Sequence, residues 1–293
     1  MIDLHCHLLP GLDDGSANLA VSLDMARMFC ADGVTVVACT PHILPGLYHN
    51  EGPLIRRAVW ELQRALDEAR IGLTLVEGAD VHLAPNLVAG LRDGRIPSLA
   101  GSRYVLVEPP HHVPPLRLEQ AFFELLVAGY VPILTHPERL TWIAAHYDVM
   151  RRLARAGVWM QVTAASLTGD FGRQAEYWGK RLLEDRIVHI LATDSHDATY
   201  RPPSLGRGRD AAERIVGALE AEHLVLTRPS GVIANRHPSS LPSAGGCAKS
   251  GDSDGCAIGD GRMSPDRRTA NYHESRNSLG RFDLARRLRR LLG

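Results

Sequence analysis

Several features that would place this chain in a common functional class are missing from its sequence. The 293 residues carry 33 basic and 33 acidic side chains, and a net charge of zero gives no indication of nucleic-acid binding. No apolar run is long enough to span a bilayer, and the opening MIDLHCH lacks the basic start and apolar core of a signal peptide. We therefore expect a cytoplasmic protein without a transmembrane segment.

The cysteines are also few and carry no recognisable spacing. All five lack the pattern of a disulfide framework or a thiolate zinc site, so we expect free thiols in a reducing compartment. The remaining composition, 45% hydrophobic and 23% charged, is that of a globular protein, and fourteen histidines are many for this length.

Apolar, β-branched runs alternate with amphipathic stretches through the first four fifths of the chain. We predict strands at 2–5, 34–39, 73–76, 104–107, 131–134, 158–162 and 188–192. Helices are expected at about 17–32, 54–70, 85–92, 116–129, 146–156, 173–185 and 206–222, with Ser16 capping the first. Seven strand–helix units favour an α/β barrel of parallel strands over the alternative, an open doubly wound sheet.

The last part of the chain has a different composition. We predict one domain over 1–236 and a flexible Gly/Ser/Pro-rich linker over 237–278. Residues 279–293 carry five arginines and could form a short basic amphipathic helix that makes weak contact with an anionic membrane surface or a partner. A disordered tail without function is the alternative.

Side chains that bind metals follow six of the seven predicted strands. They are His5, His7 and Asp14, then His42, Asp80, Glu108, His136, Asp194 and His196. Loops at the carboxyl ends of parallel strands meet at one rim, so we expect these groups to converge. Each alone is explained by a helix cap or a loop position. Together they would repel one another or require costly desolvation unless cations bind, and the pattern predicts a polynuclear metal site.

The ligand types and two arginines indicate the chemistry. Five histidines and four carboxylates without sulfur suit Mn, Fe or Zn. Two adjacent ions can activate water for phosphoester or amide hydrolysis. Arg139 follows His136 closely, and Arg201 follows the last strand. Guanidinium groups match phosphate oxygens in pairs, so both arginines favour a phosphoester substrate.

The order of these motifs resembles a known family. DLHCH, TPH, HPER and TDSH on successive strands resemble the polymerase and histidinol phosphatase (PHP) superfamily. MIDLHCHLLPGLDDGS, GADVHL, YVLVEPP, THPERL and ATDSHDATYRPPSLG resemble more closely the bacterial manganese-dependent protein-tyrosine phosphatases of capsule and exopolysaccharide loci. The resemblance implies a distorted (β/α)7 barrel of the PHP type and covers residues 1 to about 236.

The resemblance also implies a role for each site residue. One Mn²⁺ ion would bind His5, His7, Asp80 and Asp194, a second would share Asp80 and bind Glu108 and His136, and a third would bind Asp14, His42 and His196. Fe, Zn or Co could replace manganese. Arg139 and Arg201 would hold the phosphate as catalytic residues. Relatives commonly have Glu at the bridging position, where this chain has the shorter Asp80.

The implied substrate is the phosphotyrosine tail of a bacterial tyrosine autokinase that controls polysaccharide synthesis. Two other functions stay open at the level of sequence. One is a small-molecule phosphatase of the histidinol-phosphate type or an exonuclease, although the chain has no clear basic groove interleaved with aromatic side chains. The other is a non-catalytic adaptor that binds phosphopeptides. The sequence does not indicate an oligomeric state.

Overall fold

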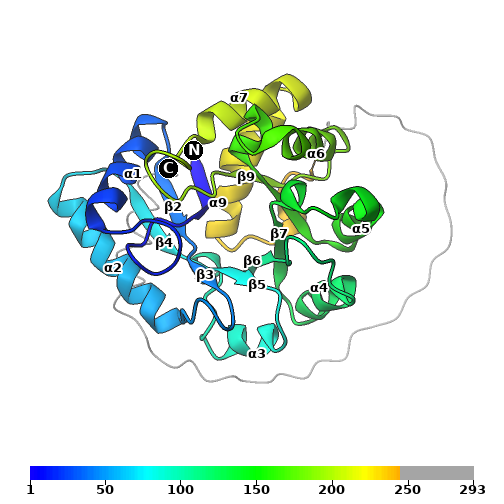
Figure 1. Ribbon diagram of the computed structural model, residues 1–293, viewed down its shortest axis with the longest axis horizontal. Helices are drawn as coiled ribbons and strands as arrows, with labels where there is room; N and C mark the ends of the chain where they lie inside the picture. Colours follow the sequence, from blue (N-terminus) through cyan, green and yellow to red (C-terminus); the bar gives the residue numbers. More distant parts are fainter. Residues whose placement is uncertain (245–293) are drawn as a thin grey trace, which may run out of the picture. The chain divides into compact units, whose positions relative to one another are not determined.

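The structure, a computed structural model, describes residues 1–244. Parallel strands lie at the centre of this part, and helices surround them (Figure 1). One sheet contains β1 (Ile2–Cys6), β2 (Val36–Cys39) and β4 (Thr74–Glu77), in the order β1-β2-β4. The other runs β3 (His42–Ile43), β5 (Asp80–His82), β6 (Tyr104–Glu108), β7 (Val131–Thr135), β8 (Trp159–Thr163) and β9 (Ile190–Ala192).

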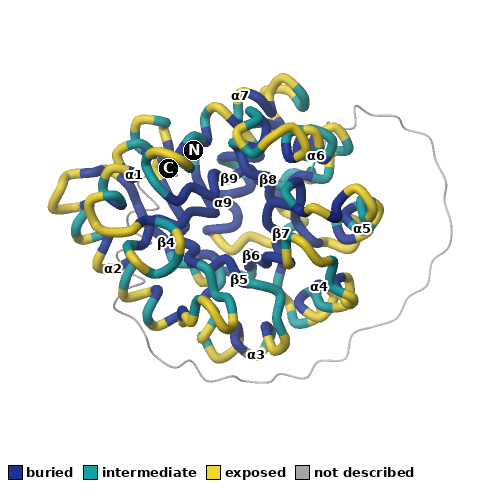
Figure 2. The backbone as a smooth tube through the Cα atoms, in the orientation of Figure 1, coloured by how far each residue is buried: buried dark blue, intermediate teal, exposed yellow. Residues whose placement is uncertain are grey.

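All seven predicted strands are present, and their ladders join into a distorted barrel. β1 meets the end of β9, where the Asp194 N–H donates to the His5 carbonyl at 2.8 Å and the His7 N–H to the Ser195 carbonyl at 2.9 Å. Most strand residues are buried (Figure 2), and β1, β6 and β7 are buried throughout, as expected when parallel strands are covered by helices on one side and fill the barrel on the other. The expected barrel is therefore found rather than an open sheet.

The distortion arises because two strands are interrupted. β2 continues as β3 after Pro41, which has no N–H to donate to a ladder, and β4 continues as β5 after Gly78. A Cβ atom at Gly78 would lie 2.8 Å from the Leu99 side chain and 3.0 Å from that of Thr40, so only glycine fits without displacement. The short strands β3 and β5 were not predicted, and they carry His42 and Asp80 toward the other sheet.

Helices follow most of the strands. They are α1 (Leu19–Ala31), α2 (Gly52–Glu68), α3 (Leu87–Arg92), α4 (Leu118–Val127), α5 (Ile143–Ala156), α6 (Gly172–Glu184), α7 (Leu205–Val216), α8 (Ala218–Glu222) and α9 (Arg228–Ile233). Two expectations need correction. The side chain of Asn18, not Ser16, caps α1 by accepting from the Val21 N–H. The helix expected at 206–222 is broken at Gly217, whose φ of 86° ends α7.

The packed part of the chain extends past the boundary at 236 that the sequence indicated. Leu241 is buried, and the buried guanidinium of Arg228 donates to the carbonyls of Pro242 and Ser243, each at 2.8 Å. The rest of the predicted linker and the predicted helix at 279–293 lie outside the described residues. Within residues 1–244, no helix is both long and apolar enough to cross a membrane.

Candidate metal centre

Seven of the nine predicted ligands lie at the carboxyl ends of strands or in the turns that follow, and His42 and Asp80 are the first residues of the short strands that continue β2 and β4. β1 carries His5 and leads to His7 and Asp14, β3 carries His42, β5 carries Asp80, β6 ends at Glu108, β7 leads to His136, and β9 leads to Asp194 and His196. The strands are parallel, so the structure brings these side chains together at one rim of the barrel. Sets of three or four of their ligand atoms lie within 4.8 Å of one another.

His5 occupies the middle of the buried part of this cluster. Its Nε2 atom lies 3.2 Å from His7 Nε2, 3.4 Å from Asp194 Oδ1 and 3.5 Å from Asp80 Oδ2. His136 belongs to a set with His5 and Asp194. A cation needs several nitrogen and oxygen atoms that face one point, and these side chains are arranged in that way.

Asp14 forms a second group nearer the solvent. Its Oδ1 atom lies 3.5 Å from His196 Nε2 and 3.6 Å from His42 Nε2, and His7 completes the set. The Asp14 side chain is half exposed, whereas both histidine rings are largely covered. Burial acts to raise the pKa of Asp14, but the hydrogen bond with His196 and the nearby imidazoles outweigh it and hold this pKa below its usual range. Asp14 is therefore a carboxylate at ordinary pH and available to a cation.

The buried groups of the cluster are poorly satisfied by the protein alone. Both carboxylate oxygens of Asp80 are buried and make no hydrogen bond within the described residues, and the same holds for His42 Nδ1 and His136 Nδ1. Burial and the neighbouring Glu108 raise the pKa of Asp80 well above its ordinary value, and burial lowers the pKa of His5 to about 3. Unpartnered buried polar atoms are costly, and divalent cations would satisfy them. The donor set thus fits a metal centre.

The DDG turn after β1 holds the His7 ring through its Nδ1 atom, on the side away from the cluster. Asp13 Oδ2 lies 2.6 Å from His7 Nδ1 and accepts from the His42 N–H at 2.9 Å, which leaves His7 Nε2 facing the cluster. Burial acts to lower the pKa of His7, but Asp13 outweighs it and raises this pKa to about 10. A carboxylate behind a ligating imidazole fixes its orientation. Gly15 is required here, since a Cβ atom would lie 2.3 Å from that of His7.

The sixth predicted strand contributes a residue that sequence reasoning missed. Gln161 on β8 is fully buried, and its Oε1 accepts from His5 Nδ1 at 3.0 Å and from the His136 N–H at 3.3 Å. It orients the His5 ring with Nε2 toward the cluster. Strand alternation could have placed Gln161 inside the barrel, because a polar side chain in the run WMQVT needs a buried partner.

The two predicted arginines lie side by side at the Asp194 end of the centre. Arg139 Nη1 and Arg201 Nη2 both donate to Asp194 Oδ2, the latter at 2.6 Å. The ring of Phe171 lies beneath them, with its centroid 4.4 Å from Arg139 Cζ and 5.5 Å from Arg201 Cζ. Burial acts to raise the pKa of Asp194, but His5 and Arg201 hold it well below its usual range. The arginines thus place positive charge beside the metal ligands.

Two further histidines face Glu108 and were not among the predicted ligands. His82 Nε2 contacts Glu108 Oε2, and His111 Nε2 lies 3.0 Å from Glu108 Oε1. Burial acts to raise the pKa of Glu108, but the imidazoles of His111 and His82 hold it well below its usual range. Both lie in stretches close after predicted strands, GADVHL and VEPPHH, so the same strand-end rule could have included them.

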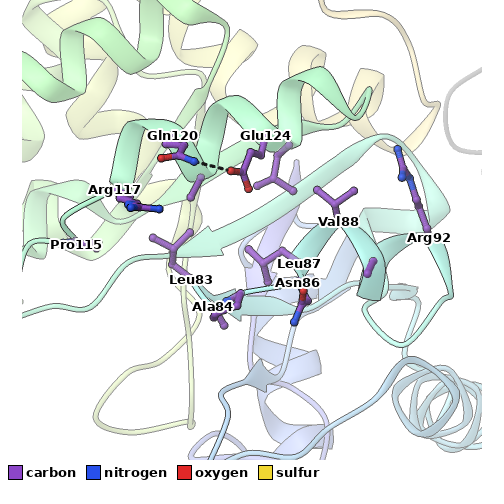
Figure 3. Close-up of a pocket in the computed structure, with 14 residues that line it drawn as sticks. Leu83, Ala84, Asn86, Leu87, Val88, Arg92, Pro115, Arg117, Gln120 and Glu124 are labelled. Atoms are coloured by element: carbon purple, nitrogen blue, oxygen red, sulfur yellow. Dashed lines mark hydrogen bonds between the residues drawn. The ribbon is translucent and has the colours of Figure 1, made fainter.

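Two pockets lie at or near this rim. One of about 410 Å³ is lined by Tyr48 and His82, and the Tyr48 ring stacks on His42 with centroids 5.7 Å apart. The other, of about 590 Å³, lies between α3 and α4, with Leu83, Leu87 and Arg117 among its lining residues (Figure 3). None of the nine predicted ligands lines this second pocket, so it is separate from the metal centre. The first pocket reaches the centre through His82.

Comparison with known proteins identifies relatives of this chain. Residues 1–234 match the family model described as capsular polysaccharide synthesis, CpsB/CapC. The tyrosine-protein phosphatase YwqE of Bacillus subtilis is 34% identical over 201 residues, which cover 69% of this chain and 79% of the relative. The tyrosine-protein phosphatase CpsB of Streptococcus pneumoniae is 25% identical over 241 residues, 80% of this chain and 99% of the relative.

A solved structure supports the same relationship. In the crystal structures of YwqE from Bacillus subtilis and CpsB from Streptococcus pneumoniae, described as metal-dependent tyrosine phosphatases, a chain superimposes with a TM-score of 0.78 at 31% identity. The match covers 81% of this chain and 96% of the other. The motifs that resemble phosphatases of capsule loci therefore reflect descent, and the chain belongs to the CpsB/CapC family of capsular polysaccharide synthesis proteins.

Proposed function

We propose that this chain is a metal-dependent protein-tyrosine phosphatase that hydrolyses phosphotyrosine. The observation that carries the proposal is the convergence of five histidines and four carboxylates on one rim, with Arg139 and Arg201 beside them. Its relatives are named tyrosine-protein phosphatases, and the solved relatives are described as metal-dependent. The donor set suits hydrolysis of a phosphate monoester, since adjacent cations held by it would activate water and the two arginines would bind phosphate oxygens.

Three ions are proposed, with the ligands that the family resemblance implies. The first would bind His5, His7, Asp80 and Asp194, the second Asp80, Glu108 and His136, and the third Asp14, His42 and His196. The short distances around His5 and Asp14 and the unpartnered oxygens of Asp80 support this division. We propose Mn²⁺ as the native ion because the family resemblance implies manganese, and a set of oxygen and nitrogen ligands is compatible with it, as with Fe or Zn.

When bound, the ions would polarise the phosphoryl oxygens and lower the pKa of water. The protein's own residues do the positioning. Arg139 and Arg201 aim their guanidinium groups at the same side of the centre, and Arg201 Nε is buried without a hydrogen bond within the described residues. A phosphoryl oxygen would satisfy that donor. Phenolate leaves readily, since its parent pKa is about 10, so a dedicated general acid is dispensable.

The proposed substrate is the phosphotyrosine tail of a bacterial tyrosine kinase in the cytoplasm. The pocket lined by Tyr48, Ile43 and Pro45 opens beside His82 and offers apolar surface to a phenyl ring and its flanking peptide. In this proposal the phenyl ring would contact the Glu108 end of the centre and the phosphate would contact the Asp194 end. The arrangement supports an aryl phosphate over a small polar one.

Phosphate release from a tyrosine-phosphorylated kinase-tail peptide tests the proposal. Activity should disappear with chelator and return when Mn²⁺ is added, and elemental analysis should find about three ions per chain. Histidinol phosphate is the comparison substrate. Equal turnover of both substrates would contradict tyrosine specificity, and binding of phosphopeptide without phosphate release would contradict catalysis.

A further inference from the structure

Three imidazoles, those of His82, His111 and His136, face Glu108, but the proposed second ion uses only His136. The proposed second ion takes Glu108, His136 and the shared Asp80, which is only three ligands. His111 faces the same carboxylate from the loop that follows β6. One candidate set of ligand atoms within 4.8 Å of one another consists of Glu108, His111 and His136.

The geometry around His111 Nε2 suits a metal ligand. This atom lies 3.0 Å from Glu108 Oε1, and His136 Nε2 lies 3.5 Å from the same oxygen. Yet His111 Nε2, which is buried, makes no hydrogen bond within the described residues. The His111 and His136 rings stand 5.0 Å apart at 65°. Two imidazole nitrogens that face the same carboxylate oxygen at these distances are arranged to bind a common cation together with it.

The loop that carries His111 is fixed against the loop that carries His136. The backbone N–H and the hydroxyl of Thr141 both donate to the His111 carbonyl at 3.0 Å, and Trp142 Nε1 donates to the Pro110 carbonyl at 3.0 Å. Pro109 and Pro110 restrict the chain between Glu108 and His111. The backbone that carries the imidazole is therefore held in place by the protein itself, as a preorganised ligand requires.

His42 cannot supply the missing ligand. It lies near Glu108 through Nδ1 at 3.5 Å but faces Asp14 through Nε2 at 3.6 Å. A neutral imidazole has one nitrogen lone pair, so His42 serves one ion at a time, and the proposed third ion uses it. His111 has no such second assignment.

We propose that His111 is a metal ligand that completes the site of Glu108 and His136. The inference rests on the proposed metal centre and extends its ligand set to ten residues. An added imidazole favours cations such as Zn²⁺, Co²⁺ and Fe²⁺ over Mg²⁺. This end of the centre therefore binds such cations more tightly than three ligands would.

Metal binding to the full chain, measured apart from activity, tests this assignment. Metal-free protein is titrated with Co²⁺, and the visible absorption and the bound metal per chain are recorded for the wild type, His111→Gln and His112→Gln. His112 is the matched control, because it is the adjacent histidine and is exposed. Loss of a supporting residue typically weakens metal binding by about 10- to 100-fold, and loss of a ligand should weaken one site at least that much. His112→Gln should bind like the wild type.

A second measurement needs no variant. Diethyl pyrocarbonate modification of the wild type, mapped by mass spectrometry, should label His111 in metal-free protein and not in Zn²⁺-loaded protein, while His112 reacts in both. Equal Co²⁺ affinity and stoichiometry in the two variants, or unchanged labelling of His111 with Zn²⁺, would overturn the assignment. Neither readout depends on phosphatase activity, so failure here is distinct from failure of the proposed reaction.

Discussion

Replacing Arg201 with methionine distinguishes two roles for this side chain, holding Asp194 in place and binding the phosphoryl group. Arg201 Nη2 donates to the carbonyl and to Oδ2 of Asp194, at 3.0 and 2.6 Å, so it could serve mainly to hold that metal ligand. Its buried Nε has no hydrogen-bond partner within the described residues and is free to hold a phosphoryl oxygen. The first role predicts weaker metal binding, and the second predicts slower turnover at full metal occupancy.

The expected change in kcat/KM follows from the free energy of the hydrogen bond that the variant loses. A hydrogen bond to a charged group contributes about 1.5–3 kcal/mol. Loss of one such bond to the phosphoryl group therefore lowers kcat/KM by about 10- to 150-fold. The Arg201→Lys variant keeps the charge but loses the planar pair of donors, so its activity should lie between those of the wild type and Arg201→Met.

Steady-state hydrolysis of a phosphotyrosine peptide, with bound metal measured on the same samples, distinguishes the roles. Arg207→Gln is the matched control, because Arg207 is exposed and pairs with Asp170 outside the centre. Arg139→Met should behave like Arg201→Met, since both guanidinium groups meet at Asp194 Oδ2 and over Phe171. If Arg201→Met matched Arg207→Gln in kcat/KM at equal metal content, the phosphate assignment would be refuted.

Three further predictions address the support of the centre and the stability of the barrel. Asp13→Asn removes the charge behind His7 and should weaken metal binding by about 10- to 100-fold, measured by titration of metal-free protein. Gly208→Ala places a methyl group 2.4 Å from the Ala164 side chain and should destabilise the fold by about 1–3 kcal/mol in urea unfolding; an unchanged midpoint would contradict this. Burial lowers the pKa of His189 to about 3, so the folded protein binds fewer protons than the unfolded chain between about pH 3 and 6.5. Stability should therefore fall as the pH drops below about 6.5, by up to about 1.4 kcal/mol per unit from this group, and His189→Gln should reduce that slope.

The predictions from sequence succeeded where local chemistry decides the structure. Each predicted strand is present because apolar β-branched runs of that length are stable only when buried in a sheet. Helix ends were less certain: Asn18 replaces Ser16 as the cap of α1, and Gly217 breaks the last predicted helix. The Ser16 hydroxyl instead donates to the Asn18 carbonyl, and the positive φ of Gly217 ends α7.

The three site residues that were not predicted from the sequence were missed for the same reason. Gln161, His82 and His111 lie on or shortly after strands, so local rules mark them only as candidates, and the packing of the strands decides whether they face the cluster. Gln161 accepts a hydrogen bond from His5 because the packing of β8 in the barrel brings the two side chains together. His111 reaches Glu108 because Thr141, thirty residues later, holds its loop.

By itself the sequence determined the strand pattern, the order of the candidate metal-binding motifs and the oxygen and nitrogen side chains that these motifs offer, since all of these follow from short segments. Only the tertiary structure decided that two strands break at Pro41 and Gly78, that the barrel closes from β1 to β9, and that Arg139 and Arg201 meet at one carboxylate. The physical reason is that distances between residues far apart in the chain are set by how the strands pack, which no single segment specifies.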